Sequence, residues 1–299
     1  MIFVFIFISC GKNDVIATLD VGQVTYITPT TAVINSSVYE IGPGVNAWNV
    51  GVCVSTQSDP GNGGEIFNGG INPYPGMNYK TGLSGLKPNT RYYVCAFVET
   101  EEATIYSDTI SFKTENINTF TDNRDGQKYM MKQIGLDTWM IENLNYYTNN
   151  SVYFQNDSSE YAKTFGRLYL YNEAEQVCPQ GWHLPTREEW TNLVNFVAND
   201  NEAGIAMKVP GTKLWNDDSN NEMTNESWFS VVPSGSANNE NSSPEFSEVG
   251  DKAIFWAQSE DQEWSYGRMF SSINGEAAEI QTRINNSDLF SVRCVKDKE

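Results

Sequence analysis

The N-terminal third of the chain alternates apolar and polar residues over short stretches that are separated by turn residues. This alternation is typical of half-buried β-strands, and it covers residues 24–28, 32–39, 48–55, 92–98 and 104–114. Runs rich in glycine, asparagine and proline at 61–64 and 72–76 predict loops. Strands at roughly ten-residue spacing, without a helical period between them, predict an antiparallel β-sandwich over residues 20–115.

The pattern changes to a helical period near residue 187. Trp190, Leu193, Val194 and Val197 recur at intervals of three, four and seven residues, which predicts one apolar helix face. Thr186 precedes this run and is followed three residues later by a glutamate, which is the pattern of a capping box. The sequence therefore predicts a helix that begins directly after Thr186.

Two segments of the N-terminal part resemble fibronectin type III domains. Leu83–Val94 is similar to the stretch that leads into strand F of such domains, and Gly51–Thr56 is similar to their strand C in exported proteins of the Bacteroidetes. The resemblance implies that Leu86 closes the end of the core and that the Tyr92 hydroxyl bonds to the preceding loop. It also implies a spacer domain rather than a binding site.

The larger part of the chain carries a second resemblance, over residues 118–297. Its motifs occur in the expected order at 125–129, 139–145, 165–169, 171–186, 225–229 and 291–297, and they resemble the Fibrobacter succinogenes major paralogous domain. The resemblance implies a C-type-lectin-like α+β fold in an exported protein. Trp139, Trp182, Trp190 and Trp256 lie at motif positions and are expected in the core, whereas Trp228 stands where glycine is usual.

The N-terminus has the features of an export signal. Seven apolar residues from Ile2 to Ile8 are far too few to span a bilayer, but they match the apolar region of a signal peptide. Phe7–Cys10 resembles a lipobox, which implies a lipid anchor on Cys10 and a truncated lipoprotein signal and tether over residues 1–19. The alternative is a buried N-terminal strand. The lipoprotein interpretation predicts an outer-membrane or cell-surface protein.

The five cysteines fit export, because removing Cys10 leaves two in each half of the chain. We expect a disulfide between Cys178 and Cys294 in the second domain. A disulfide between Cys53 and Cys95 is expected in the first, although these two thiols could instead face each other unbonded on neighbouring strands.

Charge and residue chemistry exclude several classes of function. A formal net charge of −19 disfavours binding to nucleic acid and to anionic lipid surfaces. His183 is the only histidine in the chain, so zinc sites with two histidines are excluded, and we expect His183 to be a hydrogen-bonded packing residue. The acidic run of Asp217, Asp218 and Glu222 is a weak calcium candidate, with a solvated loop as the alternative. No cofactor other than calcium is expected.

Aromatic residues in polar surroundings are the strongest binding signal. Trp228, Trp264 and Tyr266 stand among asparagine and serine, and we expect them to form one face of a shallow site with Trp215 and Asn216 at its rim. Such a site suits a glycan or a protein ligand. The sequence thus predicts a non-catalytic, surface-anchored binding or adhesion protein. The alternatives are a structural component of a surface assembly and, with low weight, an enzyme on a lectin-like scaffold.

Overall fold

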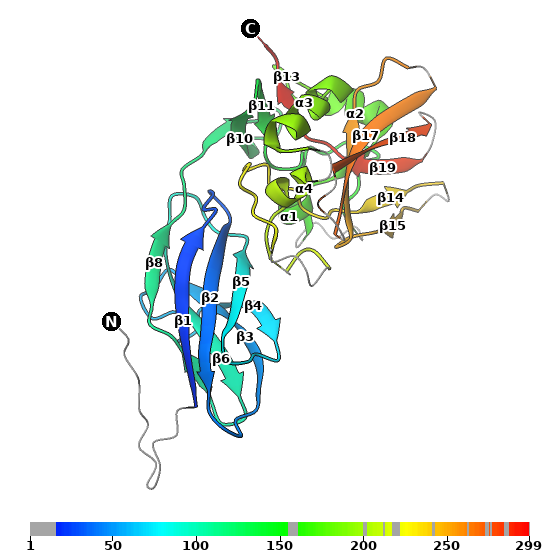
Figure 1. The fold of residues 1–299 in the computed structure, drawn as a ribbon. Helices are drawn as coiled ribbons and strands as arrows, with labels where there is room; N and C mark the ends of the chain where they lie inside the picture. The colour runs from blue at the N-terminus through cyan, green and yellow to red at the C-terminus, as the bar shows by residue number, and fades with distance from the viewer. Residues whose placement is uncertain are drawn as a thin grey trace. The chain divides into compact units, whose positions relative to one another are not determined.

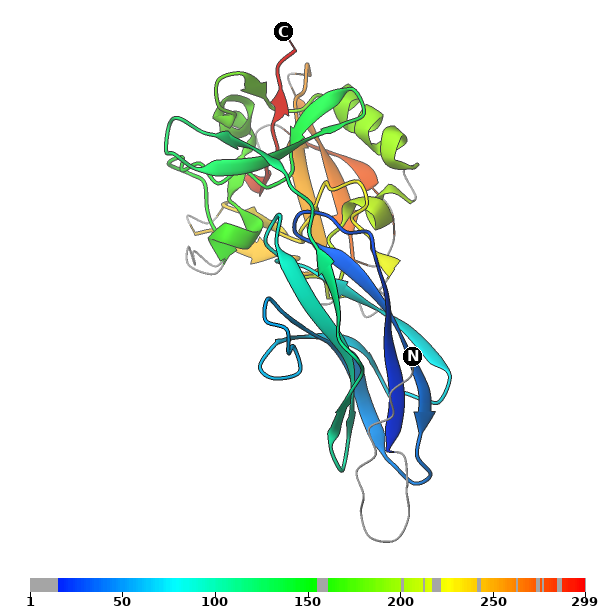
Figure 2. The ribbon, with the colours of Figure 1, turned by 90° about the vertical axis from the view of Figure 1, so that its left-hand side faces the viewer.

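The computed structural model describes residues 16–154, 161–199, 202–211, 213–216, 222–240, 243–261, 263–272, 275, 277–283 and 287–298. The chain divides into two compact units; the main division falls between Asn116 and Ile117, and the short segments Pro210–Lys213 and Asn220–Thr224 are grouped with the first unit. Each unit has its own strands (Figures 1 and 2), and each has its own core of buried side chains. Among the described residues, no helix is long and apolar enough to cross a membrane.

The first unit is a sandwich of two antiparallel sheets. Its strands are β1 (Ala17–Thr25), β2 (Ala32–Ile41), β3 (Ala47–Ser55), β4 (Glu65–Ile71), β5 (Met77–Leu83), β6 (Arg91–Thr100), β7 (Thr104–Tyr106) and β8 (Ile110–Lys113). One sheet has the order β1-β2-β5, and the other has the order β4-β3-β6-β7 with β8 also paired to β6. The predicted fibronectin type III-like sandwich is confirmed.

Alternating side chains of the two sheets fill the core between them. Val50, Val52 and Val54 of β3 point inward, and so do the equivalent residues of β6. Leu86 is buried at the end of this core, and the Tyr92 hydroxyl accepts a hydrogen bond of 2.9 Å from the backbone N–H of Lys87. Both roles that the fibronectin resemblance implied are therefore present.

The strand predictions differ from the structure at several places, and the predicted strand 104–114 is two strands, β7 and β8. The first strand begins at Ala17, seven residues before the predicted start, and β4 and β5 were not predicted. In β4 only Phe67 and Gly69 are buried, and its other positions are polar, glycine or exposed. The alternation that reveals a strand is weak there, and the pairing of β4 with β3 holds it in place.

The second unit is built on two sheets. Their strands are β9 (Asn118–Thr121), β10 (Lys128–Ile134), β11 (Asp137–Met140), β12 (Leu168–Leu170), β13 (Trp182–His183), β14 (Ser236–Asn238), β15 (Glu245–Ser247), β16 (Lys252–Ala257), β17 (Trp264–Ser271), β18 (Ala277–Arg283), β19 (Asp288–Ser291) and β20 (Val295–Lys296). The first sheet has the order β13-β20-β11-β10-β9. The second runs β15-β14-β19-β16-β17-β18, with β12 also paired to β19. β9 is the first strand of the unit and β20 is the last. Both lie in the same sheet, so the two ends of the unit are joined by hydrogen-bonded strands.

Within the described residues, four short helices accompany the sheets. They are α1 (Tyr161–Phe165), α2 (Tyr171–Val177), α3 (Arg187–Val197) and α4 (Ala203–Met207). Helix α3 begins as predicted. Thr186 accepts a hydrogen bond from the N–H of Glu189 at 3.1 Å, and the Glu189 carboxylate accepts one from the N–H of Thr186 at 2.8 Å. The α+β class predicted for this unit is confirmed.

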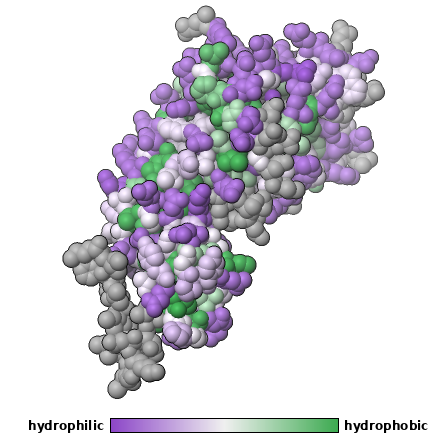
Figure 3. All heavy atoms as spheres, viewed as in Figure 1, coloured by the Kyte–Doolittle hydropathy of each residue, from purple (hydrophilic) through white to green (hydrophobic). Residues whose placement is uncertain are grey.

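The core of the second unit is rich in aromatic rings. Trp139, Trp182, Trp190 and Trp256 are all less than 7% exposed, as predicted. Trp139 and Trp190 pack with their ring centroids 5.0 Å apart, and the fully buried ring of Phe229 packs edge-on against both. On the face drawn in Figure 3, by contrast, hydrophilic residues predominate and apolar residues are scattered among them.

Candidate ligand-binding face on β17 and β18

Two of the predicted aromatic residues lie side by side on the second sheet. Trp264 and Tyr266 are two residues apart on β17, so they point to the same face, and both are half-buried. Gln281 of β18 pairs with Tyr266, and its Nε2 donates to the Tyr266 hydroxyl at 3.3 Å. An aromatic row with a neighbouring amide is therefore presented at the surface of this sheet.

Arg187, the first residue of α3, completes this arrangement. Its guanidinium carbon lies 3.8 Å from the centroid of the Tyr266 ring. Its Nη2 and Nε bond to the two oxygens of Glu279 at 2.6 and 3.1 Å. We call Arg187, Trp264, Tyr266, Glu279 and Gln281 the β17–β18 face. Ring faces beside an amide and a charged pair can both stack on an apolar ligand surface and hydrogen-bond to hydroxyl groups.

The backbone that presents Trp264 is fixed by local hydrogen bonds. The Asp261 carboxylate accepts from the N–H groups of Glu263 and Trp264, at 2.7 and 3.2 Å. The Ser259 hydroxyl donates to the carbonyl of Trp264 at 2.6 Å. The polar residues around Trp264 thus form a turn that positions the ring, and this agrees with the sequence signal that singled it out.

Trp228 contacts β10, which is not part of the β17–β18 face. Its half-buried ring is covered by Lys132 of β10, whose ammonium nitrogen is 3.8 Å from the ring centroid. The backbone at Trp228 has φ of 67°, a left-handed conformation that is unfavourable for a bulky side chain. Asn225 and Ser230 share this conformation, with φ of 52° and 58°.

A buried arginine, Arg293, holds the loop that carries Trp228 through hydrogen bonds to its backbone. Arg293 is 1% exposed, and its guanidinium bonds to Oδ1 of Asn143 at 2.9 Å, to the carbonyl of Ser230 at 2.7 Å and to the carbonyl of Phe229. Burial lowers the pKa of Arg293 to about 9. No carboxylate within ion-pair distance of Arg293 occurs in the part of the chain that the structure describes. The loop carbonyls accept the N–H groups of this buried guanidinium, and the Coulombic attraction of Glu142 opposes the lowering of its pKa.

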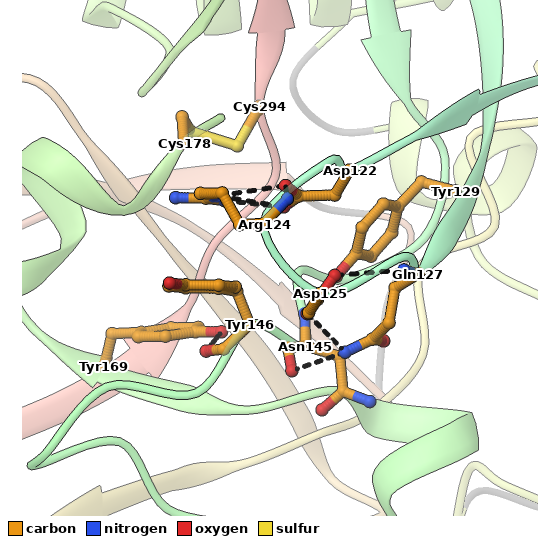
Figure 4. Close-up of polar contacts among 10 residues, drawn as sticks. All are labelled: Asp122, Arg124, Asp125, Gln127, Tyr129, Asn145, Tyr146, Tyr169, Cys178 and Cys294. Carbon is orange, nitrogen blue, oxygen red and sulfur yellow. Dashed lines mark hydrogen bonds and ion pairs between the residues drawn. A yellow bond between two sulfur atoms is a disulfide. The ribbon is translucent and has the colours of Figure 1, made fainter. Parts of the chain in front are cut away.

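A polar turn between β9 and β10 forms a cluster that was not predicted as a site, although residues 125–129 are one of the family motifs. The buried Asp122 carboxylate accepts from Nε and Nη2 of Arg124 at 3.0 and 2.6 Å. The guanidinium of Arg124 lies over the ring of Tyr146, 3.8 Å from its centroid (Figure 4). Gln127 and Tyr129 then bond to the backbone of Asn145, at 3.1 Å each, and join the turn to the segment after β11. The Asp125-Gly126 pair marks this turn in the sequence.

Residues 115–296 match the family model described as the Fibrobacter succinogenes major domain, and this range is more than half of the chain. The chain belongs to this family. The resemblance that the sequence motifs showed is thereby established for the second unit. The match gives no activity and no ligand.

Several solved structures are similar to parts of the chain. A structure of the sensor domain of the anti-sigma factor RsgI4 from Pseudobacteroides cellulosolvens is 18% identical, covers 34% of this chain and 97% of its own, and has a TM-score of 0.28. A solution structure of the same domain is 17% identical, with 37% and 84% covered and a TM-score of 0.30. The third fibronectin III domain of human KIAA0343 is 18% identical, with 33% and 82% covered and a TM-score of 0.22. TM-scores this low support no conclusion, and none of the curated proteins compared matches the chain.

The rim predicted for the site is wrong at Trp215. This residue of the Fibrobacter succinogenes major domain is 1% exposed, and the Nζ of the buried Lys208 lies 5.0 Å from its ring centroid. Lys208 in turn donates to the carbonyl of Ser271 at 2.6 Å. Polar neighbours in the sequence suggested exposure, but the ammonium group of the buried Lys208 lies over the indole ring. Asn216 is exposed and bonds to Asp251 at 3.2 Å.

The calcium candidates are only partly placed. Asp217 and Asp218 lie outside the described residues, and Glu222 is exposed. Among the residues whose positions the structure gives, no group of three or more acidic, histidine or cysteine side chains could hold a metal ion.

His183 makes two polar contacts that link the start of α3 to the end of the domain. Its Nε2 lies 3.0 Å from the Glu189 carboxylate, and its Nδ1 lies 2.7 Å from Asp297. The hydrogen bond to Glu189, followed by that to Asp297, raises the pKa of His183 to about 8 against the opposing effect of burial. The expected hydrogen bonding of His183 is confirmed, and its side chain is 33% exposed.

The four described cysteines behave differently in the two units. Cys178 and Cys294 form the predicted disulfide, which closes a sequence separation of 116 residues and is drawn in Figure 4. Cys53 and Cys95 are opposite each other on β3 and β6 but are free, so the expected second disulfide is wrong and the alternative, two unbonded thiols on neighbouring strands, is confirmed. Side chains that face across a ladder have Cβ atoms about 4.5–5.5 Å apart, wider than the roughly 3.8 Å of a disulfide. Cys10 lies outside the described residues.

Proposed function

We propose that this protein is a non-catalytic surface lipoprotein whose Fibrobacter succinogenes major domain binds glycans through the β17–β18 face. The observation that supports this most is the pair of half-exposed rings, Trp264 and Tyr266, fixed side by side with Gln281 and Arg187. Sugar rings stack on aromatic faces through their C–H groups, while amides and guanidinium groups take up the hydroxyl groups. Because the turn and the sheet hold these side chains, little conformational entropy is lost when a ligand binds.

A surface location is the second part of the proposal. The Cys178–Cys294 disulfide suggests an extracytoplasmic domain, because such bonds persist in oxidising compartments. We propose that lipid on Cys10 anchors the protein and that the fibronectin type III-like unit acts as a spacer. Changing Cys10 to Ala should move the protein from the membrane fraction to the soluble fraction. Retention of the variant in membranes would refute the anchor.

A glycan array tests the binding function. The full chain with Cys10→Ala serves as the soluble probe, with and without a calcium chelator. Variants Trp264→Ala and Tyr266→Ala should lose at least tenfold in affinity for the bound glycan. Trp48→Ala is the matched control, because Trp48 is a 44% exposed tryptophan of the first unit. Its affinity should be unchanged.

Two outcomes would contradict the proposal. If the array shows no glycan ligand, a structural role in a surface assembly becomes the better interpretation. If a glycan binds but the Trp264→Ala and Tyr266→Ala variants bind it as well as Trp48→Ala does, the site lies elsewhere. Unfolding in urea should accompany the measurement, because a large loss of stability in Trp264→Ala would show that the ring is part of the core.

A further inference from the structure

An ion pair joins helix α3 to strand β18 at the edge of the β17–β18 face. Nη2 and Nε of Arg187 donate to the two carboxylate oxygens of Glu279, at 2.6 and 3.1 Å. Both side chains reach solvent, since Arg187 is 47% exposed and Glu279 is 36% exposed. The positive and the negative charge of the face therefore lie together, and each remains accessible to a ligand.

The ion pair lies directly beside the aromatic rings. The guanidinium carbon of Arg187 is 3.8 Å from the ring centroid of Tyr266, so the charged group covers one face of that ring. Trp264 precedes Tyr266 by two residues on β17, which corresponds to about 6.5 Å along a strand. A ligand that contacts both Trp264 and the ion pair is therefore expected to contain more than one sugar ring.

The carboxylate of Glu279 determines what Arg187 can bind. An arginine without a partner offers a planar fork of N–H donors, which fits a carboxylate through two parallel hydrogen bonds. In this protein Glu279 occupies that fork and supplies the balancing negative charge. A carboxylate on a ligand would meet the like charge of Glu279, whereas an uncharged hydroxyl group would not.

Sugar hydroxyl groups fit the same ion pair. Each hydroxyl group can both donate and accept hydrogen bonds. Neighbouring hydroxyl groups of one sugar can therefore accept from the guanidinium of Arg187 and donate to the carboxylate of Glu279. The amide of Gln281 and the hydroxyl of Tyr266, which bond to each other at 3.3 Å, add a donor and acceptors on the same face. The polar groups of the face thus complement an uncharged ring that is rich in hydroxyl groups.

We propose that Glu279 makes the β17–β18 face specific for neutral oligosaccharides and excludes acidic ones. This inference rests on the proposed glycan-binding function, and it adds the class of glycan and the residue that selects it. Removing the charge of Glu279 leaves Arg187 with an uncompensated positive charge at an exposed position, so the same face then favours a uronic acid. The formal net charge of −19 also repels acidic chains from the wild-type protein.

A glycan array of matched pairs tests this specificity. The pairs are tetrasaccharides of β-linked glucose, β-linked mannose and α-linked galactose, each printed next to the chain whose exocyclic CH₂OH groups are oxidised to carboxylates. The probe is the full chain with Cys10→Ala, and calorimetry in solution measures the affinities for every pair that binds. The wild type should bind the neutral member of a pair at least tenfold more tightly than the acidic member.

Three variants assign the specificity to Glu279. Glu279→Gln keeps the shape of the side chain but removes its charge, and it should bind the acidic member of the same pair at least tenfold more tightly than the wild type does. Arg187→Gln combined with Glu279→Gln should lose this gain, because the gain comes from the freed guanidinium group. Glu188→Gln is the matched control. It makes the same change of charge at an exposed neighbour of Arg187, and it should keep the preference of the wild type.

The outcomes separate this inference from the proposed function. If Trp264→Ala weakens glycan binding but the bound glycan is acidic, or Glu279→Gln keeps the wild-type preference, the face binds glycans and only the selective role of Glu279 is refuted. If Glu279→Gln shifts the preference towards acidic chains while Trp264→Ala has no effect on any glycan, the selective role stands and the aromatic part of the proposed site is refuted. Absence of binding to all of these chains, by the wild type and by Glu279→Gln, overturns the inference even where other glycans bind.

Discussion

Trp228 holds its indole ring 3.8 Å from the ammonium nitrogen of Lys132 while its own backbone is left-handed, with φ of 67°. The resemblance to the family placed this tryptophan where glycine is usual, and the backbone angle is the one that glycine adopts without strain. The chain therefore carries a large side chain at a position whose backbone conformation favours glycine. Hydrogen bonds between Asn225 and Ser230, at 2.7 and 2.8 Å, keep the loop in this conformation.

The backbone strain at this position predicts an unusual order of stabilities. Trp228→Gly and Trp228→Ala both remove the ring, but only alanine retains the Cβ that makes φ of 67° unfavourable. The glycine variant should be more stable than the alanine variant by about 1 kcal/mol. Urea denaturation of the two variants measures this difference. An alanine variant of equal or greater stability would show that the strain is absent.

The disulfide should contribute strongly to the stability of the second unit. Replacing both Cys178 and Cys294 by Ala should lower the free energy of unfolding by about 2–4 kcal/mol, because the bond closes a long loop in the unfolded chain. Reductant should destabilise the wild-type protein by a similar amount. The matched control is the Cys53→Ala, Cys95→Ala variant, which should remain as sensitive to reductant as the wild type. Insensitivity of the wild type to reductant would contradict the prediction.

Arg293 should be the most sensitive polar position of the domain. Arg293→Ala leaves the carbonyls of Phe229 and Ser230 and the amide oxygen of Asn143 without their donor, so the free energy of unfolding should fall by about 3 kcal/mol or more. Arg293→Lys should be intermediate, because one ammonium group cannot reach all three acceptors. Arg187→Lys changes one member of the exposed Arg187–Glu279 ion pair, and it should lower the free energy of unfolding by less than about 1 kcal/mol. Equal losses at the two positions would refute the special role of Arg293.

The sequence predicted the parts of the fold that depend on neighbouring residues. The capping box at Thr186 and Glu189 and the loop contact of Tyr92 are local, so their residue types alone determine them. The start of β1 and the strand β4 depend on pairing with other strands, and their own alternation is weak. These elements could not be predicted for that reason.

The site residues show the same difference between features set by neighbouring residues and features set by remote ones. Trp264 and Tyr266 are two apart in one strand, so the period of a strand places them on one face. Trp215 was wrongly expected at the rim because its burial depends on Lys208 and β17, which are remote in the sequence from its polar neighbours.

His183 makes the stability of the domain depend on pH near neutrality. Its pKa in the folded protein is raised to about 8, first by the hydrogen bond to Glu189 and then by that to Asp297, whereas an unfolded chain has a histidine pKa of about 6.5. A raised pKa means that the folded state binds the proton more tightly. The resulting stabilisation is fully present below pH 6.5 and is lost as the pH rises through 8.

The size of this effect is reduced by solvent, because the His183 side chain is 33% exposed. We expect the free energy of unfolding to fall by about 1 kcal/mol between pH 6 and pH 8.5. Since the chain contains one histidine, no other imidazole titrates in this interval. His183→Gln should remove most of this pH dependence, and it should be less stable than the wild type at pH 6 but nearly equal to it at pH 8.5. Urea denaturation of both proteins across this range measures how the free energy of unfolding changes with pH. If His183→Gln shows the same change as the wild type, the contacts with Glu189 and Asp297 do not raise the proton affinity of His183.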